Sequence, residues 1–155
     1  MKRSRIYLDT SVIGGCFDAQ FAQWSNSLIK DFATGTFLPI LSDVLAAEIQ
    51  DAPEAVRQKY DELLRGDHEL VVVSEEALEL AEAYQRREIL TPKYYDDGLH
   101  IALASIAEAD LLVSWNFRHI VHFDKIRLFN SVNLGLGYKP LQIYSPREVT
   151  KAEGD

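Results

Sequence analysis

The 155-residue chain is long enough for one domain with a substantial core, and its 47% hydrophobic and 26% charged residues are typical of globular proteins. A single cysteine, Cys16, excludes an intrachain disulfide and fits a reducing cytoplasm. The net charge of −8 disfavours a generic nucleic-acid binder unless clustered acids hold divalent cations. No apolar run approaches the ~20 residues of a membrane span, so we expect a cytoplasmic protein without membrane contact.

Short apolar runs alternate with helical patterns along the whole chain. The predicted strands are residues 6–8, 37–42, 69–74, 110–115 and 140–145. The predicted helices are residues 23–35, a helix that starts at Ser42 or Asp43, then residues 53–66, 75–89 and 94–109, and a helix with a turn over 119–137. Pro39 predicts strain or a nearby sheet edge within its strand. The alternation predicts an α/β fold with a parallel sheet covered on both faces. We expect a single domain over residues 1–150 and a short tail over 151–155.

The acids can be sorted by their position along the strands, because sites in such sheets form beyond the carboxyl ends of strands at a topological switch point. Asp9 follows the first strand directly and satisfies this rule, although an aspartate there also serves as a helix N-cap. Asp110 precedes the apolar run LLVSW, at the start of its strand, and therefore belongs at the opposite edge.

Glu48 interrupts an otherwise apolar helix, DVLAAEI, that follows the second strand. A buried carboxylate requires a cation, a hydrogen-bond network or contact with solvent. Asp97 opens a later helix and shares a face with His100, whereas Asp96 is rotated toward solvent. We therefore prefer Asp97 to Asp96; a favourable helix-dipole position is the alternative explanation for either acid.

Asn116 follows the fourth strand at its carboxyl end. Its amide oxygen can serve as a weak metal ligand, and the alternative is that Asn116 is a turn residue. Three converging carboxylates, Asp9, Glu48 and Asp97, repel one another unless a cation neutralises them. Oxygen ligands select Mg²⁺ or Mn²⁺, which activate water for attack on phosphate esters. The hydroxyls of Thr10, Ser11 and Ser114 are candidates to orient water or the Asp9 carboxylate.

Three segments carry a resemblance to a known family: LDTSVI with Asp9, the helix with Glu48, and DGLHIALA with Asp97. With the following LLVSWNFRHI, they occur in the same order as in PIN domains, including VapC-type toxins of toxin–antitoxin systems. The resemblance covers nearly the whole chain. It implies an α/β/α PIN fold with Asp9, Glu48 and Asp97 as the acidic site.

The resemblance also implies an Mg²⁺- or Mn²⁺-dependent ribonuclease that acts on an RNA substrate, forms a homodimer and is restrained by an antitoxin. The family commonly has a fourth acid in a Thr-x-Asp pattern, where this chain has Ser114-Trp115-Asn116. That departure, with the acidic charge, supports an alternative: a PIN-fold protein that binds RNA or a partner without cleaving it.

Other residues are assigned no site role from the sequence. The cations near the site segments, which can contact RNA phosphates, are Arg86, Arg87, Lys93 and Arg118. His100, His119 and His122 lack metal spacing and are interpreted as packing or surface residues, and Trp115 as a core or interface residue. A haloacid-dehalogenase-like phosphatase is the rival enzyme class, but it requires an aspartate where this chain has Ser11.

Overall fold

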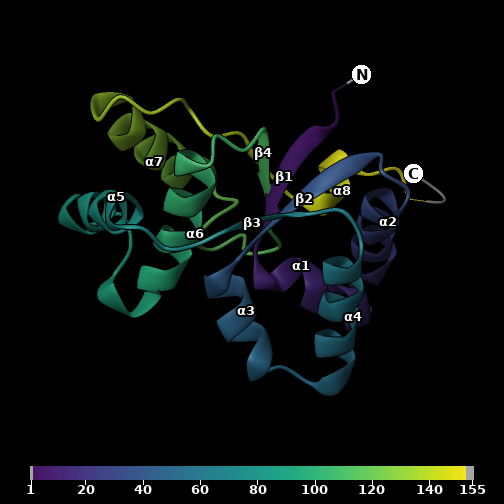
Figure 1. The fold of residues 1–155 in the computed structure, drawn as a ribbon. Helices are drawn as coiled ribbons and strands as arrows, with labels where there is room; N and C mark the ends of the chain where they lie inside the picture. The colour runs from purple at the N-terminus through teal and green to yellow at the C-terminus, as the bar shows by residue number, and fades with distance from the viewer. Residues whose placement is uncertain (1, 153–155) are drawn as a thin grey trace.

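The computed structural model describes residues 2–152, which form a five-stranded sheet in the order β3-β2-β1-β4-β5 (Figure 1). Its strands are β1 (Ser4–Leu8), β2 (Phe37–Ser42), β3 (Glu69–Val71), β4 (Leu111–Val113) and β5 (Ile143–Tyr144). Every strand pair is parallel, which confirms the predicted fold class. The division into a domain over 1–150 and a tail over 151–155 stays a prediction, and residues 1 and 153–155 lie outside the described part.

The helices follow the strands in the predicted alternation. They are α1 (Thr10–Gly14), η1 (Gly15–Phe17), α2 (Ala22–Ala33), α3 (Asp43–Gln50), α4 (Glu54–Arg65), α5 (Glu75–Arg86), η2 (Pro92–Tyr94), α6 (Tyr95–Ile106), α7 (Phe123–Gly135) and α8 (Pro146–Val149). Local chemistry explains several of their starts. The hydroxyl of Ser42 accepts a hydrogen bond from the Leu45 amide and so caps α3, and Ser74 caps α5 in the same way.

The two faces of the sheet bury alternate residues of each strand, as the pleat requires. Tyr7 of β1 and Leu112 of β4 pack into one core with α5, α6 and α7. Ile6, Leu8 and Val113 pack into a second core with α1, α2, α3 and α4. Figure 1 shows these two groups of helices on opposite sides of the strands. The sheet is therefore the middle layer of an α/β/α sandwich.

The third, fourth and fifth strands are shorter than predicted, the first begins earlier, at Ser4, and the second has its predicted bounds. The third strand ends at Val71 rather than residue 74, and Val72 beyond it is 62% exposed. Pro39 lies in β2, an interior strand, but β2 pairs with β3 only from Ile40 onward. The missing N–H of proline is thus tolerated because no ladder partner has begun on that side.

The topology defines one switch point. From β1 the chain moves outward to β2 and β3 on one side, and then returns to place β4 and β5 on the other. The carboxyl ends of β1 and β4 therefore flank the position where α/β sheets commonly bind ligands. Among the helices of residues 2–152, none is long and apolar enough to cross a membrane.

Candidate active site

Asp9 lies directly after β1 at this switch point and is 5% exposed. It occupies the N-cap position of α1, but its side chain makes no capping hydrogen bond. Its carboxylate is instead held by two hydroxyls: Ser11 donates to Oδ1 over 2.6 Å and Ser114 donates to Oδ2 over 2.7 Å. The backbone at Asp9 thus begins a helix, while the side chain belongs to a polar cluster.

The segment after β4 completes the surroundings of Asp9. The amide of Trp115 donates to Ser11 Oγ over 2.8 Å, and that of Asn116 donates to Ser114 Oγ over 2.9 Å. Each serine therefore accepts a backbone hydrogen bond and donates one from its hydroxyl to Asp9. This arrangement fixes both serine hydroxyls as donors toward the carboxylate.

Glu48 projects from α3 and is held through one oxygen. Thr10 Oγ1 donates to Glu48 Oε1 over 3.1 Å, and His100 Nε2 lies 2.6 Å from the same oxygen. Thr10 thus supports Glu48, whereas Ser11 and Ser114 support Asp9. The Glu48 side chain remains 37% exposed, so it reaches solvent as well as the cluster.

Asp97 lies in the first turn of α6 and is also held through one oxygen. Asn116 Nδ2 donates to Asp97 Oδ2 over 3.3 Å, and His119 Nδ1 lies 3.1 Å from that oxygen. Asn116 is a turn residue too, because its Oδ1 accepts the His119 amide over 2.9 Å. The structure thus shows the turn role of Asn116, whereas its role as a metal ligand stays a prediction. Asp96 beside it is exposed.

The charges of these groups act on one another. Burial raises the pKa of Asp9, against the opposing effects of His100 and the two serine hydrogen bonds. Burial likewise raises the pKa of Asp97, with a further contribution from the charge of Glu48. The surroundings of Asp9 and Asp97 thus disfavour the ionised forms of both carboxyl groups.

Glu48 and His100 shift in complementary directions. Burial alone would raise the pKa of Glu48, but the hydrogen bond and charge of His100 and the hydrogen bond from Thr10 together outweigh burial, and the pKa is lowered. Burial alone would lower the pKa of His100, but Glu48, Asp9 and Asp97 raise it. One histidine therefore interacts with all three acids.

A divalent metal suits the chemistry of this donor set. Within residues 2–152, Glu48 Oε2 and Asp97 Oδ1 make no hydrogen bond, so each acid is fixed by one oxygen and offers the other. No group of three His, Cys, Asp or Glu side chains in this range forms a preformed metal-binding site. Mg²⁺ does not require one, because it keeps several waters and commonly uses one or two carboxylates.

The other sequence candidates fall outside the cluster. Asp110 accepts the Arg5 amide over 2.7 Å at the opposite edge of the sheet. Arg86 lines a surface groove with Leu136 of the α7 end. Trp115 is 7% exposed and bonds Ser25 through Nε1, as expected of a core residue.

Sequence reasoning missed the two histidines of the cluster. His100 and His119 were interpreted as packing or surface residues, yet each contacts one of the candidate acids. The signal for His100 was its position three residues after Asp97 on one helical face. No comparable signal marked His119, because its contact depends on the turn after β4.

Comparison with solved structures supports the expected fold. A chain in the crystal structure of VapBC2 from Rickettsia felis, bound to a DNA fragment from their promoter, matches with a TM-score of 0.58 and 16% identity. The match covers 91% of this chain and 98% of that chain. No family model matches the sequence. No curated protein matches it. At this identity the likeness shows a shared fold alone, and it agrees with the α/β/α fold that the resemblance to PIN domains implies.

Proposed function

We propose that this protein is a divalent-metal-dependent endoribonuclease of the VapC-like type. The observation that carries the proposal is the proximity of Asp9, Glu48 and Asp97 to one buried histidine, His100, whose charge acts on all three carboxylates. Carboxylates gathered in partly buried surroundings are unfavourable without a cation. Their arrangement is therefore better explained by a bound ion than by stability of the fold.

Mg²⁺ or Mn²⁺ is the proposed cofactor, with Asp9, Glu48, Asp97 and the amide oxygen of Asn116 as candidate ligands. When bound, such an ion activates water and stabilises charge on a phosphoryl oxygen. The protein's own part is to hold the acids in place: Ser11 and Ser114 fix Asp9, Thr10 and His100 fix Glu48, and Asn116 and His119 fix Asp97.

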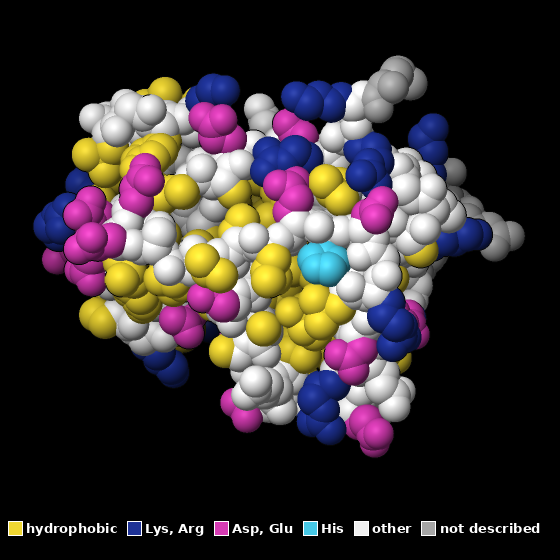
Figure 2. Space-filling view, in the orientation of Figure 1, with side chains coloured by type: hydrophobic (Ala, Val, Ile, Leu, Met, Phe, Trp, Pro, Cys, Tyr) yellow, Lys and Arg dark blue, Asp and Glu magenta, His cyan; other side chains and the backbone are white. Residues whose placement is uncertain are grey.

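RNA is the proposed substrate despite the net charge of −8. On the face shown in Figure 2, basic and acidic side chains are interspersed. Local cations beside the site are therefore the proposed phosphate contacts. Arg118 is exposed two residues after Asn116. Lys93 lies 5.6 Å from the centre of the Tyr94 ring, which in turn lies 3.9 Å from the ring of His119.

An antitoxin and a second copy of the chain are the proposed protein partners. The support for the antitoxin is the structural likeness to a chain of a VapBC2 structure. The homodimer follows from the resemblance of the sequence segments to PIN domains. Both proposals are checked by the mass of the protein purified alone and after co-expression with its neighbouring reading frame.

The second candidate function is a PIN-fold protein that binds RNA or a partner without cutting it. Asn116 favours this candidate, because a neutral amide stands where the family commonly has an acid, and it donates to Asp97 rather than adding charge. The two candidates differ in one measurable property, which is cleavage that depends on a divalent ion.

The deciding experiment incubates purified protein with a mixed RNA pool and Mg²⁺ or Mn²⁺. We expect cleavage that stops with EDTA and is lost in Asp9→Asn and Asp97→Asn. Asp110→Asn is the matched control, because Asp110 lies at the far edge of the sheet, and it should cut normally. No cleavage of any RNA by the wild type would favour the binding-only candidate.

The chemistry of the ends tests the proposed route. Attack by external water leaves a 5′-phosphate and a 3′-hydroxyl, whereas attack by the neighbouring 2′-hydroxyl leaves a 2′,3′-cyclic phosphate. We expect the former, and sequencing of the cleavage ends would also identify the preferred RNA site. Cyclic phosphates, or cleavage that persists in EDTA, would contradict the proposal.

A further inference from the structure

His100 is the least exposed side chain that contacts the candidate acids through a ring nitrogen. It is 2% exposed and lies in α6, one turn after Asp97. Its two nitrogens face different partners: Nε2 lies 2.6 Å from Glu48 Oε1, and Nδ1 lies 2.6 Å from the Tyr7 hydroxyl. A fully buried imidazole with both nitrogens engaged has one orientation available to it.

The contact with Tyr7 continues a buried polar chain through the sheet. The Tyr7 hydroxyl lies 2.8 Å from Ser42 Oγ, and Ser42 Oγ accepts the Leu45 amide over 3.1 Å. The chain thus starts at the N-cap of α3 and reaches Glu48 of the same helix through β1 and α6. Tyr7 and Ser42 are both fully buried, so water does not compete for these hydrogen bonds.

The proton on Nε2 follows from its partner. A carboxylate only accepts hydrogen bonds, so the nitrogen that faces Glu48 carries a proton whether the ring is neutral or charged. The Tyr7 hydroxyl can either donate to Nδ1 or accept from it, and Ser42 can complement both choices. The orientation of Glu48 therefore does not depend on the charge of His100.

We propose that His100 is a positioning residue, which holds Glu48 through Oε1 so that Oε2 is presented to the reacting centre, and that Tyr7 holds the ring in place. This inference rests on the proposed ribonuclease function. Glu48 needs such support, because its side chain is 37% exposed and would otherwise sample several rotamers. Thr10 approaches the same oxygen, so the two donors together fix the carboxylate plane.

The activity test compares two substitutions of His100. Leucine removes the donor, whereas glutamine keeps an amide donor close to the position of Nε2. We expect His100→Leu to lower kcat about 10–100-fold with KM for RNA unchanged, the usual effect of losing a group that orients a ligand. His100→Gln should recover most of that loss. In both variants Tyr7 keeps Ser42 as a partner, so both should fold, which circular dichroism checks.

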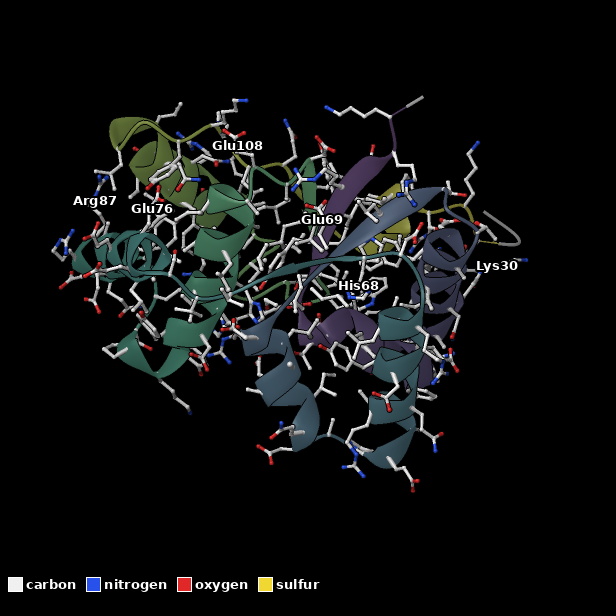
Figure 3. The ribbon with its side chains drawn as sticks, in the orientation of Figure 1. Lys30, His68, Glu69, Glu76, Arg87 and Glu108 are labelled. Atoms are coloured by element: carbon white, nitrogen blue, oxygen red, sulfur yellow. The ribbon has the colours of Figure 1, made fainter. Side chains whose placement is uncertain are left out.

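His68→Gln is the matched control. His68 precedes β3 at the other end of the sheet, where its Nδ1 lies 2.9 Å from the Gly66 carbonyl oxygen (Figure 3). It should leave kcat unchanged. A folded His100→Leu variant with wild-type kcat would overturn the inference, and so would a His100→Gln variant as impaired as the leucine one.

A second readout requires no activity. In protein labelled with ¹⁵N at histidine, we expect a His100 Nε2–H resonance that exchanges slowly with water. Glu48→Gln should move this proton upfield, because an amide oxygen accepts more weakly than a carboxylate. His68→Gln should not move it. If the chemical shift of this proton is the same in Glu48→Gln as in the wild type, the inference is overturned even in an active enzyme. The expected shift in a protein that cuts no RNA would support the His100–Glu48 link and refute the proposed function instead.

Discussion

The Ser114 hydroxyl donates to Oδ2 of Asp9 over 2.7 Å and so joins the ends of β1 and β4 at the switch point of the sheet. Ser114 is fully buried, and its oxygen also accepts the amide of Asn116. One hydroxyl therefore holds both a candidate catalytic acid and the turn that carries Asn116. Because Ser114 makes both contacts, we expect its substitution to disturb Asp9 and the turn together.

Replacing Ser114 with alanine should affect both stability and cleavage. The change removes the donor to Asp9 and leaves the Asn116 amide without its acceptor. Unsatisfied buried groups cost about 1–3 kcal/mol, so the urea midpoint should fall. Cleavage should decrease about 10–100-fold through loss of Asp9 orientation. Ser114→Thr keeps the hydroxyl and should retain more activity than alanine; equal activity of alanine and wild type would contradict the assigned role.

Asp9→Asn should stabilise the metal-free protein at neutral pH. Burial raises the pKa of Asp9 above its usual 3.8, so the folded state binds this proton more tightly than the unfolded state. The ionised Asp9 carboxylate therefore lowers the free energy of unfolding at pH values above its folded pKa. This destabilisation disappears as the pH falls below 3.8, where the carboxyl group is protonated in both states. A serine hydroxyl can accept from the new amide.

The measurement is thermal unfolding in EDTA at a series of pH values. The Tm of Asp9→Asn should exceed that of the wild type at pH 7, by about 2–4 °C for each kcal/mol that the substitution adds to the free energy of unfolding. The difference should shrink as the pH is lowered. Millimolar Mn²⁺ should raise the Tm of the wild type and not that of the variant, since the ion stabilises only the state that binds it. An advantage that grows at low pH would be inconsistent with a raised pKa.

The fold was largely predictable because periodicity and caps are local properties. The strand 37–42 has its predicted bounds, and α3 begins at Asp43 after a Ser42 cap, one of the two starts expected. Strand ends were less predictable, since they depend on neighbouring strands. The strand expected over 110–115 ends at Val113; the Ser114 amide still donates to the Tyr144 carbonyl, and the amides of Trp115 and Asn116 then donate to side chains.

The candidate site was predictable only in part. The strand-end rule selected Asp9, and helical phase favoured Asp97 over the exposed Asp96. The roles of these residues stay predictions. Which hydroxyl supports which acid was not predictable, because Thr10 and Ser11 are neighbours in sequence and bond different carboxylates. The buried link from Ser42 to Glu48 joins residues of four elements, β2, β1, α6 and α3, and leaves no pattern in any one of them.

Arg5 offers a test of stability that is separate from the site. At the amino ends of the strands, its guanidinium binds both Glu69 oxygens and donates to the carbonyls of Ala107 and Glu108, which follow α6. Figure 3 labels Glu69 and Glu108. Arg5→Ala should lower the free energy of unfolding by about 1–3 kcal/mol, after allowance for solvent screening.

The pH dependence of this contribution has a definite sign. Arg5 lowers the pKa of Glu69, so the ion pair stabilises the protein above the usual Glu69 value of 4.5 and is lost as pH falls through the folded pKa. Urea unfolding at pH 7 and pH 3 should therefore show a smaller effect of Arg5→Ala at the lower pH. Cleavage should be unchanged under conditions where the variant is folded; a specific loss of cleavage would show that the two sheet edges are coupled.

Asn116→Asp probes the position where a fourth acid is missing. The aspartate keeps an oxygen for the His119 amide but replaces the amide that donates to Asp97 with a second carboxylate. Repulsion between the two acids should lower the Tm in EDTA. Because the added charge binds a cation more tightly, the increase in Tm with Mn²⁺ should be larger than in the wild type and should grow with Mn²⁺ concentration. Cleavage should be retained or raised, since a carboxylate holds a second ion better than an amide does. An Mn²⁺ response equal to that of the wild type, with no change in cleavage, would mean that residue 116 serves the turn alone.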